Sequence, residues 1–117
     1  MAQAQQNTVT VTEVGTWPVD GFEGHEARIL TVEVPVGQHA PVHLRPGSQY
    51  IWVARGTVTS RLEGEEARTF TAGDAWYEPR ERRHVEFGND GDTDAQVVVF
   101  YVTEPGRPVL TFAGDPG

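Results

Sequence analysis

Hydrophobic and polar residues alternate in short runs along most of the chain, and glycine and proline separate these runs. A period of two is typical of β-strands, because successive side chains of a strand point to opposite faces of its sheet. The best helical candidate, Ser60–Phe70, is interrupted by Gly64 and alternates better as two strands. We therefore predict an all-β protein, built as an antiparallel sandwich or barrel.

Each predicted strand is bounded by turn-forming residues. The alternation of threonine and valine in Thr8–Val14 predicts a half-buried strand, and the segment Trp17–Gly24 is expected to be a loop. Ala95–Val102 is the most apolar run and should form a central strand of the core. The expected strands are Thr8–Val14, Ala27–Val34, Val42–Arg45, Gln49–Arg55, Thr57–Leu62, Ala67–Thr71, Ala75–Glu78, His84–Phe87, Ala95–Val102 and Val109–Phe112.

Two hairpins are expected from the turn residues between these strands. Thr57–Leu62 should pair with Ala67–Thr71 around a glycine-containing turn. A second hairpin should form through Pro46-Gly47-Ser48, which pairs Arg45 with Gln49 and places His43 on the same face. A histidine, an arginine and an amide on an otherwise apolar face need partners, so this face is expected to bind a ligand, a metal ion or water.

The composition limits the classes of protein and partner. The length of 117 residues predicts one domain, spanning residues 1–117, with residues 1–7 expected to fray. The formal net charge of −8 opposes binding to nucleic acid, which requires clustered lysine and arginine. No apolar run reaches membrane-spanning length, no signal peptide is visible and there is no cysteine, so a cytoplasmic protein without a membrane partner is expected.

Two spaced motifs carry a resemblance to a known superfamily. The pattern Gly37-x5-His43-x-Arg45-x3-Gln49-x6-Gly56 resembles the first motif of the cupins, G-x5-H-x-H-x3-4-E-x6-G. The resemblance implies a small double-stranded β-helix, which is a jelly-roll-type barrel.

The second motif follows in the expected order. The pattern Gly73-x5-Pro79-x-Glu81-x2-His84 resembles the second cupin motif, G-x5-P-x-G-x2-H-x3-N. Either motif alone is a weak signal, whereas both within one β-rich chain are specific to the fold.

The resemblance also implies a ligand set for one divalent transition metal, such as Zn, Fe, Ni, Mn or Cu. The ligand positions of typical cupins fall on His43, Gln49 and His84, while Arg45 replaces the second histidine and Gln49 replaces the usual glutamate. Arginine cannot donate a lone pair, and glutamine offers only a neutral oxygen. We therefore expect weaker metal binding than in the complete site, or loss of the metal.

Two further residues are candidates for contact with a substrate. Arg45 is either a partly exposed residue at a strand end or a pocket residue that holds an anion. Glu86 shares the face of His84 if the strand is regular, but Asn89 lies one position later than in the family pattern, which indicates a bulge that reverses this facing. His39 lies about 13 Å of strand away from His43 and is expected at the mouth or the surface.

These residues predict a small barrel that binds a divalent metal and a small organic molecule, as a metal-dependent dioxygenase, isomerase or lyase. No catalytic residue is assigned. The alternatives are a metal-free module that binds a small anion through Arg45, His43 and His84, and a barrel used only for contact with a partner. Tyr50 and Trp52 lie on the face opposite the site, so a homodimer is expected.

Overall fold

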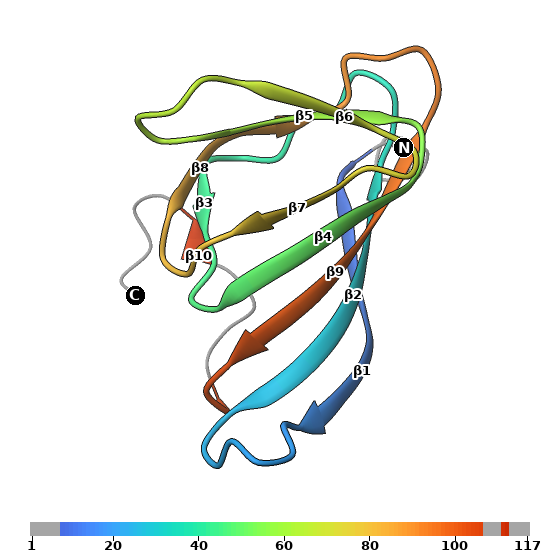
Figure 1. The fold of residues 1–117 in the computed structure, drawn as a ribbon. Helices are drawn as coiled ribbons and strands as arrows, with labels where there is room; N and C mark the ends of the chain where they lie inside the picture. The colour runs from blue at the N-terminus through green and yellow to red at the C-terminus, as the bar shows by residue number, and fades with distance from the viewer. Residues whose placement is uncertain (1–7, 107–110, 113–117) are drawn as a thin grey trace.

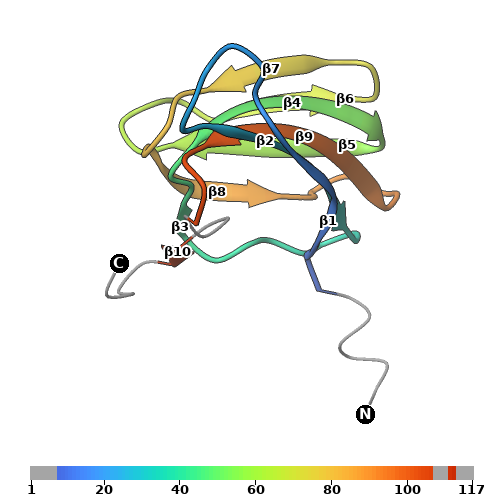
Figure 2. The same ribbon diagram turned by 90° about the horizontal axis from the view of Figure 1, so that it is seen from below.

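Two five-stranded antiparallel sheets form the walls of a barrel in the computed structural model, which describes residues 8–106 and 111–112 (Figures 1 and 2). The first sheet has the strand order β1-β2-β9-β4-β7 and the second has the order β10-β3-β8-β5-β6. The strands are β1 (Thr10–Pro18), β2 (Glu26–Val34), β3 (His43–Leu44), β4 (Ser48–Arg55), β5 (Thr57–Leu62), β6 (Arg68–Thr71), β7 (Ala75–Glu78), β8 (Arg83–Gly88), β9 (Ala95–Thr103) and β10 (Thr111–Phe112).

The all-β prediction is confirmed, and the described residues contain no helix. None of them therefore belongs to a helix that is able to cross a membrane. The predicted hairpin of β5 and β6 is also confirmed, with Thr57 opposite Thr71. Of the predicted strand Val109–Phe112, only Thr111 and Phe112 are among the described residues, and they form β10. The predicted fraying concerns residues 1–7, which lie outside the described residues.

The core is built around β9, as its apolar sequence predicts. This strand pairs along its whole length with β2 on one side and from Gln96 to Val102 with β4 on the other. Its alternate side chains Val97, Val99 and Tyr101 are buried, because they point into the barrel. The apolar core therefore lies against the first sheet and forms one wall of the interior.

The first predicted strand is placed correctly in part, but its predicted burial is wrong. β1 begins at Thr10 and continues through Trp17 and Pro18, which the sequence places in a loop. Eight of its nine residues are exposed, because β1 is an edge strand that pairs only with β2. The alternation of threonine and valine indicates a strand, but it does not show whether another layer covers the strand.

The predicted hairpin through Pro46-Gly47-Ser48 is wrong. β3 pairs with β8 and β10, whereas β4 pairs with β7 and β9 in the other sheet. The chain therefore crosses between the sheets near Gly47, whose amide donates a hydrogen bond of 2.9 Å to the Tyr101 hydroxyl. A β-carbon at Gly47 would collide with the carbonyl oxygen of Val102, so glycine allows the close passage here.

Candidate functional site

Two histidines from neighbouring strands meet inside the barrel. His43 on β3 is directly opposite His84 on β8, and their ring centroids are 4.7 Å apart. Both side chains are buried. The two motifs therefore converge, although through a ladder between β3 and β8 that the sequence analysis did not anticipate.

Gln49 reaches the same interior from the opposite sheet. It lies on β4 directly opposite Glu78 on β7, and both side chains are almost completely buried. Between the two sheets lies an inner cavity of about 20 Å³, which is large enough for about one water molecule or one ion. The polar residues that line the inner cavity are His43, Arg45, Gln49, Glu78 and His84.

Glu78 is the member of this group that sequence reasoning missed. Its Oε2 atom accepts hydrogen bonds from Trp76 Nε1 at 2.8 Å and from Ser60 Oγ at 3.0 Å. Its Oε1 atom lies 2.9 Å from His84 Nε2 but has no hydrogen bond. The available signal was the alternation in β7, which places Glu78 on the same face as the core residue Trp76.

The ionisation of Glu78 reflects two opposing effects. Burial alone would raise the pKa of Glu78, because it penalises the charged form. The neighbouring His84 and the hydrogen bonds from Trp76 and Ser60 outweigh burial and hold the pKa below its usual value. The carboxylate is therefore ionised at neutral pH, so the interior carries a negative charge beside the imidazoles.

The surroundings of His84 place contradictory demands on its Nε2 atom. The Gln49 amide nitrogen lies 3.3 Å away and is a donor, so that contact requires a lone pair on Nε2. The Glu78 carboxylate requires a proton on the same atom. His84 Nδ1 has no hydrogen-bond partner among the described residues. The ring is therefore incompletely satisfied, which is costly for a buried polar group.

His43 has a defined tautomer. Its Nδ1 atom donates a hydrogen bond of 2.8 Å to the Pro41 carbonyl, which leaves the lone pair on Nε2. Burial lowers the pKa of His43 to about 4, with a further lowering by the nearby His84. The ring is therefore neutral at neutral pH, which is the form that binds metal ions.

Arg45 lies between the inner cavity and a larger outer cavity of about 80 Å³. Its side chain is buried, which lowers its pKa, although tyrosine and glutamate neighbours oppose this effect. His43, Arg45 and Phe87 line both cavities. The remaining lining of the outer cavity is formed by Val9, Val11, Val32, Ala40 and Pro41. Arg45 therefore lines the cavities and is not a partly exposed residue at a strand end.

Glu86 does not line either cavity. The register of β8 against β5 shifts between Arg61 and Leu62, so that Glu86 lies opposite Arg61 while His84 lies opposite Leu62. The bulge inferred from the position of Asn89 is therefore present, and it turns Glu86 away from the cavity. Glu86 is instead 3.8 Å from Arg61 in an ion pair.

His39 also lies outside the cavities, as expected from its distance along the chain. Its Nε2 atom is 2.8 Å from Asp90 Oδ1 at the protein surface. Ligand atoms of His39, Glu86 and Asp90 all lie within 4.8 Å of one another. We call these three residues the surface cluster.

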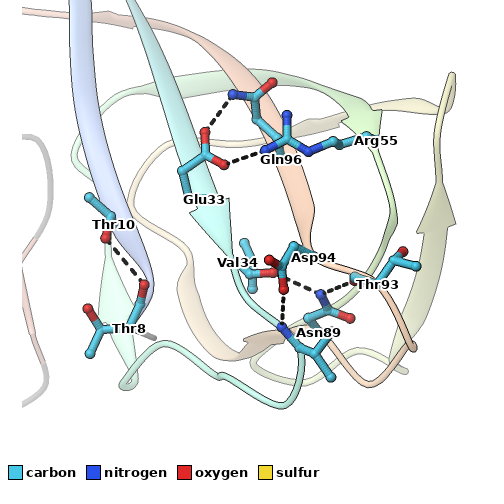
Figure 3. Close-up of polar contacts among 10 residues, drawn as sticks. Thr8, Thr10, Glu33, Val34, Arg55, Asn89, Thr93, Asp94 and Gln96 are labelled. Atoms are coloured by element: carbon cyan, nitrogen blue, oxygen red, sulfur yellow. Dashed lines mark hydrogen bonds and ion pairs between the residues drawn. The ribbon is translucent and has the colours of Figure 1, made fainter. Parts of the chain in front are cut away.

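Asn89 holds the loop that follows β8 (Figure 3). Its side-chain nitrogen donates hydrogen bonds of 2.8 Å to the carbonyl groups of Val34 and Thr93. Its side-chain oxygen accepts a hydrogen bond from the Gly91 amide at 2.9 Å. This buried residue therefore has a structural role in fixing the end of β8.

Comparisons with known proteins agree with this architecture. A family model described as "Cupin domain" matches residues 30–101. A search among curated protein sequences finds no significant match.

Several solved structures share the fold. DMSP lyase DddQ from Ruegeria pomeroyi superposes with a TM-score of 0.73 at 16% identity, over 93% of this chain and 53% of that protein. An RmlC-like cupin family protein from Methanocaldococcus jannaschii gives a TM-score of 0.68 at 19% identity, over 85% of this chain and 84% of that protein. An oxalate oxidase bound to the substrate analogue glycolate gives 0.69 at 24% identity, over 92% of this chain and 56% of that protein.

The chain spans about half the length of the two enzymes in these comparisons. Identities below 25% indicate a shared fold and do not transfer an activity. The double-stranded β-helix, the order of the two motifs and the family match over residues 30–101 lead to one conclusion. The chain belongs to the cupin family.

Proposed function

We propose that this protein binds a divalent transition metal in the inner cavity and a small organic molecule in the outer cavity. The observation that carries the proposal is the pair of buried imidazoles at an ion-sized cavity. His43 and His84 come from different motifs, and their rings are 4.7 Å apart. Two unrelated core histidines have no physical reason to converge on one small cavity.

The donor chemistry fits such an ion. His43 presents a lone pair on Nε2 because its Nδ1 atom is bonded to a carbonyl group. The Gln49 side chain offers its amide oxygen as a ligand after a rotation of the amide group that exchanges the positions of its nitrogen and oxygen. In a metal-bound state, His84 Nε2 carries no proton. Imidazole ligands suit Zn, Fe, Ni or Cu. Arg45 opposes the binding of a dication, and the ionised Glu78 offsets that charge.

The outer cavity limits the size of the organic molecule. A volume of about 80 Å³ admits a few non-hydrogen atoms, and its walls are mainly apolar. Arg45 places a cationic group at the boundary between the two cavities, which favours a small carboxylate. Two structural neighbours are named for small organic compounds, DMSP and oxalate, and one of them is bound to glycolate.

Different residues of the chain would bind the substrate and exclude water at such a site. Arg45 orients the anionic end of the substrate, and Phe87 with the aliphatic lining excludes water. A bound metal would act as a Lewis acid toward a substrate oxygen or toward water. This arrangement supports dioxygenase, isomerase or lyase chemistry.

One observation favours metal-free anion binding as a second candidate function. If the proton of a neutral His84 ring is on Nε2, that N–H group faces the Glu78 carboxylate at 2.9 Å, so the carboxylate has a polar neighbour without a metal. Arg45 would then bind a small carboxylate together with the histidines. The sequence predicts the same alternative.

Metal analysis of the untagged protein separates the two candidates. Metal binding predicts about one ion per chain, and its loss in both His43→Ala and His84→Ala. Anion binding predicts no bound metal, but thermal stabilisation by glycolate or oxalate that Arg45→Ala abolishes. A protein that takes up no Zn²⁺, Fe²⁺, Ni²⁺ or Cu²⁺ contradicts the metal proposal.

We further propose that a second copy of the chain covers the outer face of β4, β7 and β9. Four large side chains are exposed there in a contiguous group, with Tyr50 5.2 Å from Tyr77 and 6.0 Å from Phe100. These residues and Trp52 are uncharged, so two copies with a net charge of −8 each could meet without placing like charges together. Light scattering should give a dimer mass that Trp52→Glu reduces to that of a monomer.

A further inference from the structure

We propose that Glu78 supplies the carboxylate of the metal site, in place of the glutamate that Gln49 replaces. The carboxylate ligand would then lie on β7, and not on the neighbouring strand β4 where the family motif places it. This inference rests on the proposed metal-binding function and names a ligand at an unspecified position of the second motif, directly before Pro79. It concerns one carboxylate oxygen, Glu78 Oε1.

The register of the first sheet makes this exchange possible. Gln49 and Glu78 are directly opposite each other on β4 and β7. Directly opposed residues on one sheet face have β-carbons about 4.5–5.5 Å apart. A carboxylate on β7 can therefore enter the cavity that a glutamate on β4 would enter, and both side chains line that cavity.

The two oxygens of Glu78 have different surroundings. Oε2 accepts hydrogen bonds from Trp76 and Ser60, which fix the orientation of the carboxylate. Oε1 is buried and has no hydrogen bond, although the residue is only 1% exposed. An unsatisfied buried polar atom destabilises the fold, and more strongly if it is charged. A cation bound to Oε1 removes this cost.

The position of Oε1 relative to His84 also suits a shared ion. The two atoms Oε1 and Nε2 are 2.9 Å apart without hydrogen-bond geometry. Two ligands at right angles on one ion, each at about 2.1 Å, are separated by about 3.0 Å. A metal-bound His84 Nε2 is unprotonated and needs no acceptor, so its contact with the Glu78 carboxylate no longer requires a proton between the two atoms.

Charge provides the third argument. Two neutral imidazoles and an amide carry no net charge, while Arg45 adds a positive charge at the cavity. A dication in that set would meet only repulsion from charged groups. Glu78 is the one carboxylate among the described residues that line the inner cavity.

An exchange experiment tests the assignment. The affinity for Zn²⁺ and the visible spectrum of bound Co²⁺ are measured for the full chain, Glu78→Gln, Gln49→Glu and the double variant Gln49→Glu/Glu78→Gln. Glu78→Gln should weaken binding of Zn²⁺ by more than about 100-fold and change the Co²⁺ spectrum. The double variant should recover most of the affinity, because it returns the carboxylate to β4.

Matched controls separate a ligand from a positioning residue. Ser60→Ala removes one hydrogen bond to Oε2 but keeps Oε1, so it should weaken Zn²⁺ binding only about 10-fold and leave the Co²⁺ spectrum similar. Glu63→Gln removes an exposed carboxylate whose partner is Arg83 and should change neither readout. These controls also exclude a general effect of net charge.

Three outcomes are decisive. Unchanged Zn²⁺ affinity and an unchanged Co²⁺ spectrum in Glu78→Gln overturn the assignment but leave the proposed function intact. No binding of either ion by the unmodified chain overturns the proposed function itself. If Glu78→Gln does not fold, Glu78→Asp gives the same comparison, because it keeps the charge but shortens the side chain by one methylene group. A Zn²⁺ affinity of Glu78→Asp equal to that of the unmodified chain then overturns the assignment.

Discussion

The two groups of histidine and carboxylate side chains in this barrel differ in burial and in the partners of their polar atoms. The inner group consists of His43, His84 and Glu78, while the surface cluster consists of His39, Glu86 and Asp90. Both groups include a residue of β8. The bulge in β8 separates them, because it directs His84 inward and Glu86 outward.

Burial gives the two groups different energetics. In the surface cluster, water and the neighbouring Arg61 compensate the carboxylates, and exposed ion pairs contribute little to stability. In the inner group, Glu78 Oε1 and His84 Nδ1 have no hydrogen bond and little access to water. The difference is that the inner group has buried polar atoms without partners, which are the ground for placing the candidate site there and not at the surface cluster.

The largest expected effect comes from His84→Ala. It leaves the Glu78 carboxylate buried without its imidazole neighbour, which costs about 3–5 kcal/mol when one partner of a buried pair is removed. The free energy of unfolding should fall by this amount in urea denaturation of chelator-treated protein. A loss below about 1 kcal/mol would show that the inner pair is as weakly coupled as the surface cluster.

Acid should destabilise the metal-free protein through His43. The folded-state pKa of about 4 lies below the ordinary value of 6.5, so the unfolded chain binds a proton first as the pH falls. The contribution of the neutral His43 ring to the free energy of unfolding is complete above pH 6.5. It is lost progressively toward pH 4, and the loss reaches up to about 3 kcal/mol. Urea denaturation across this range measures it, and His43→Gln should flatten the dependence. Equal slopes in the two proteins would contradict the prediction.

The smallest effect is expected in the surface cluster. His39→Ala removes the contact with Asp90, in which both side chains are largely exposed. Its free energy of unfolding should change by less than about 0.5 kcal/mol, and Zn²⁺ binding in the inner cavity should be unchanged. Loss of the bound ion in this variant would transfer the proposed metal site from the interior to the surface cluster.

The sequence predicts the architecture well and the strand neighbours less well. Alternation and glycine spacing locate most strands, and the apolar run Ala95–Val102 correctly indicates the centre of a sheet. The error at Pro46-Gly47-Ser48 has a physical cause. A short turn between two alternating runs is compatible with a hairpin or with a crossing between sheets, and the local pattern is the same in both cases.

The candidate site is predicted only in part for a related reason. His43, Gln49 and His84 stand in recognisable motifs, and Asn89 indicates the bulge that removes Glu86 from the cavity. Glu78 stands at an unspecified position of the second motif, and its importance depends on the strand opposite it. Pairing between β4 and β7 is a long-range property, so no local pattern reveals that Gln49 has a carboxylate beside it.

The crossing at Gly47 has a consequence for how such a protein could change its ligand preference over time. Tyr101 holds the Gly47 amide, and Arg45 and Gln49 stand two residues before and two residues after that point, on different walls of the interior. A substitution at Tyr101 would therefore displace the Arg45 guanidinium and the Gln49 amide together. The selectivity for a bound molecule could therefore change through substitution of a residue that does not line either cavity.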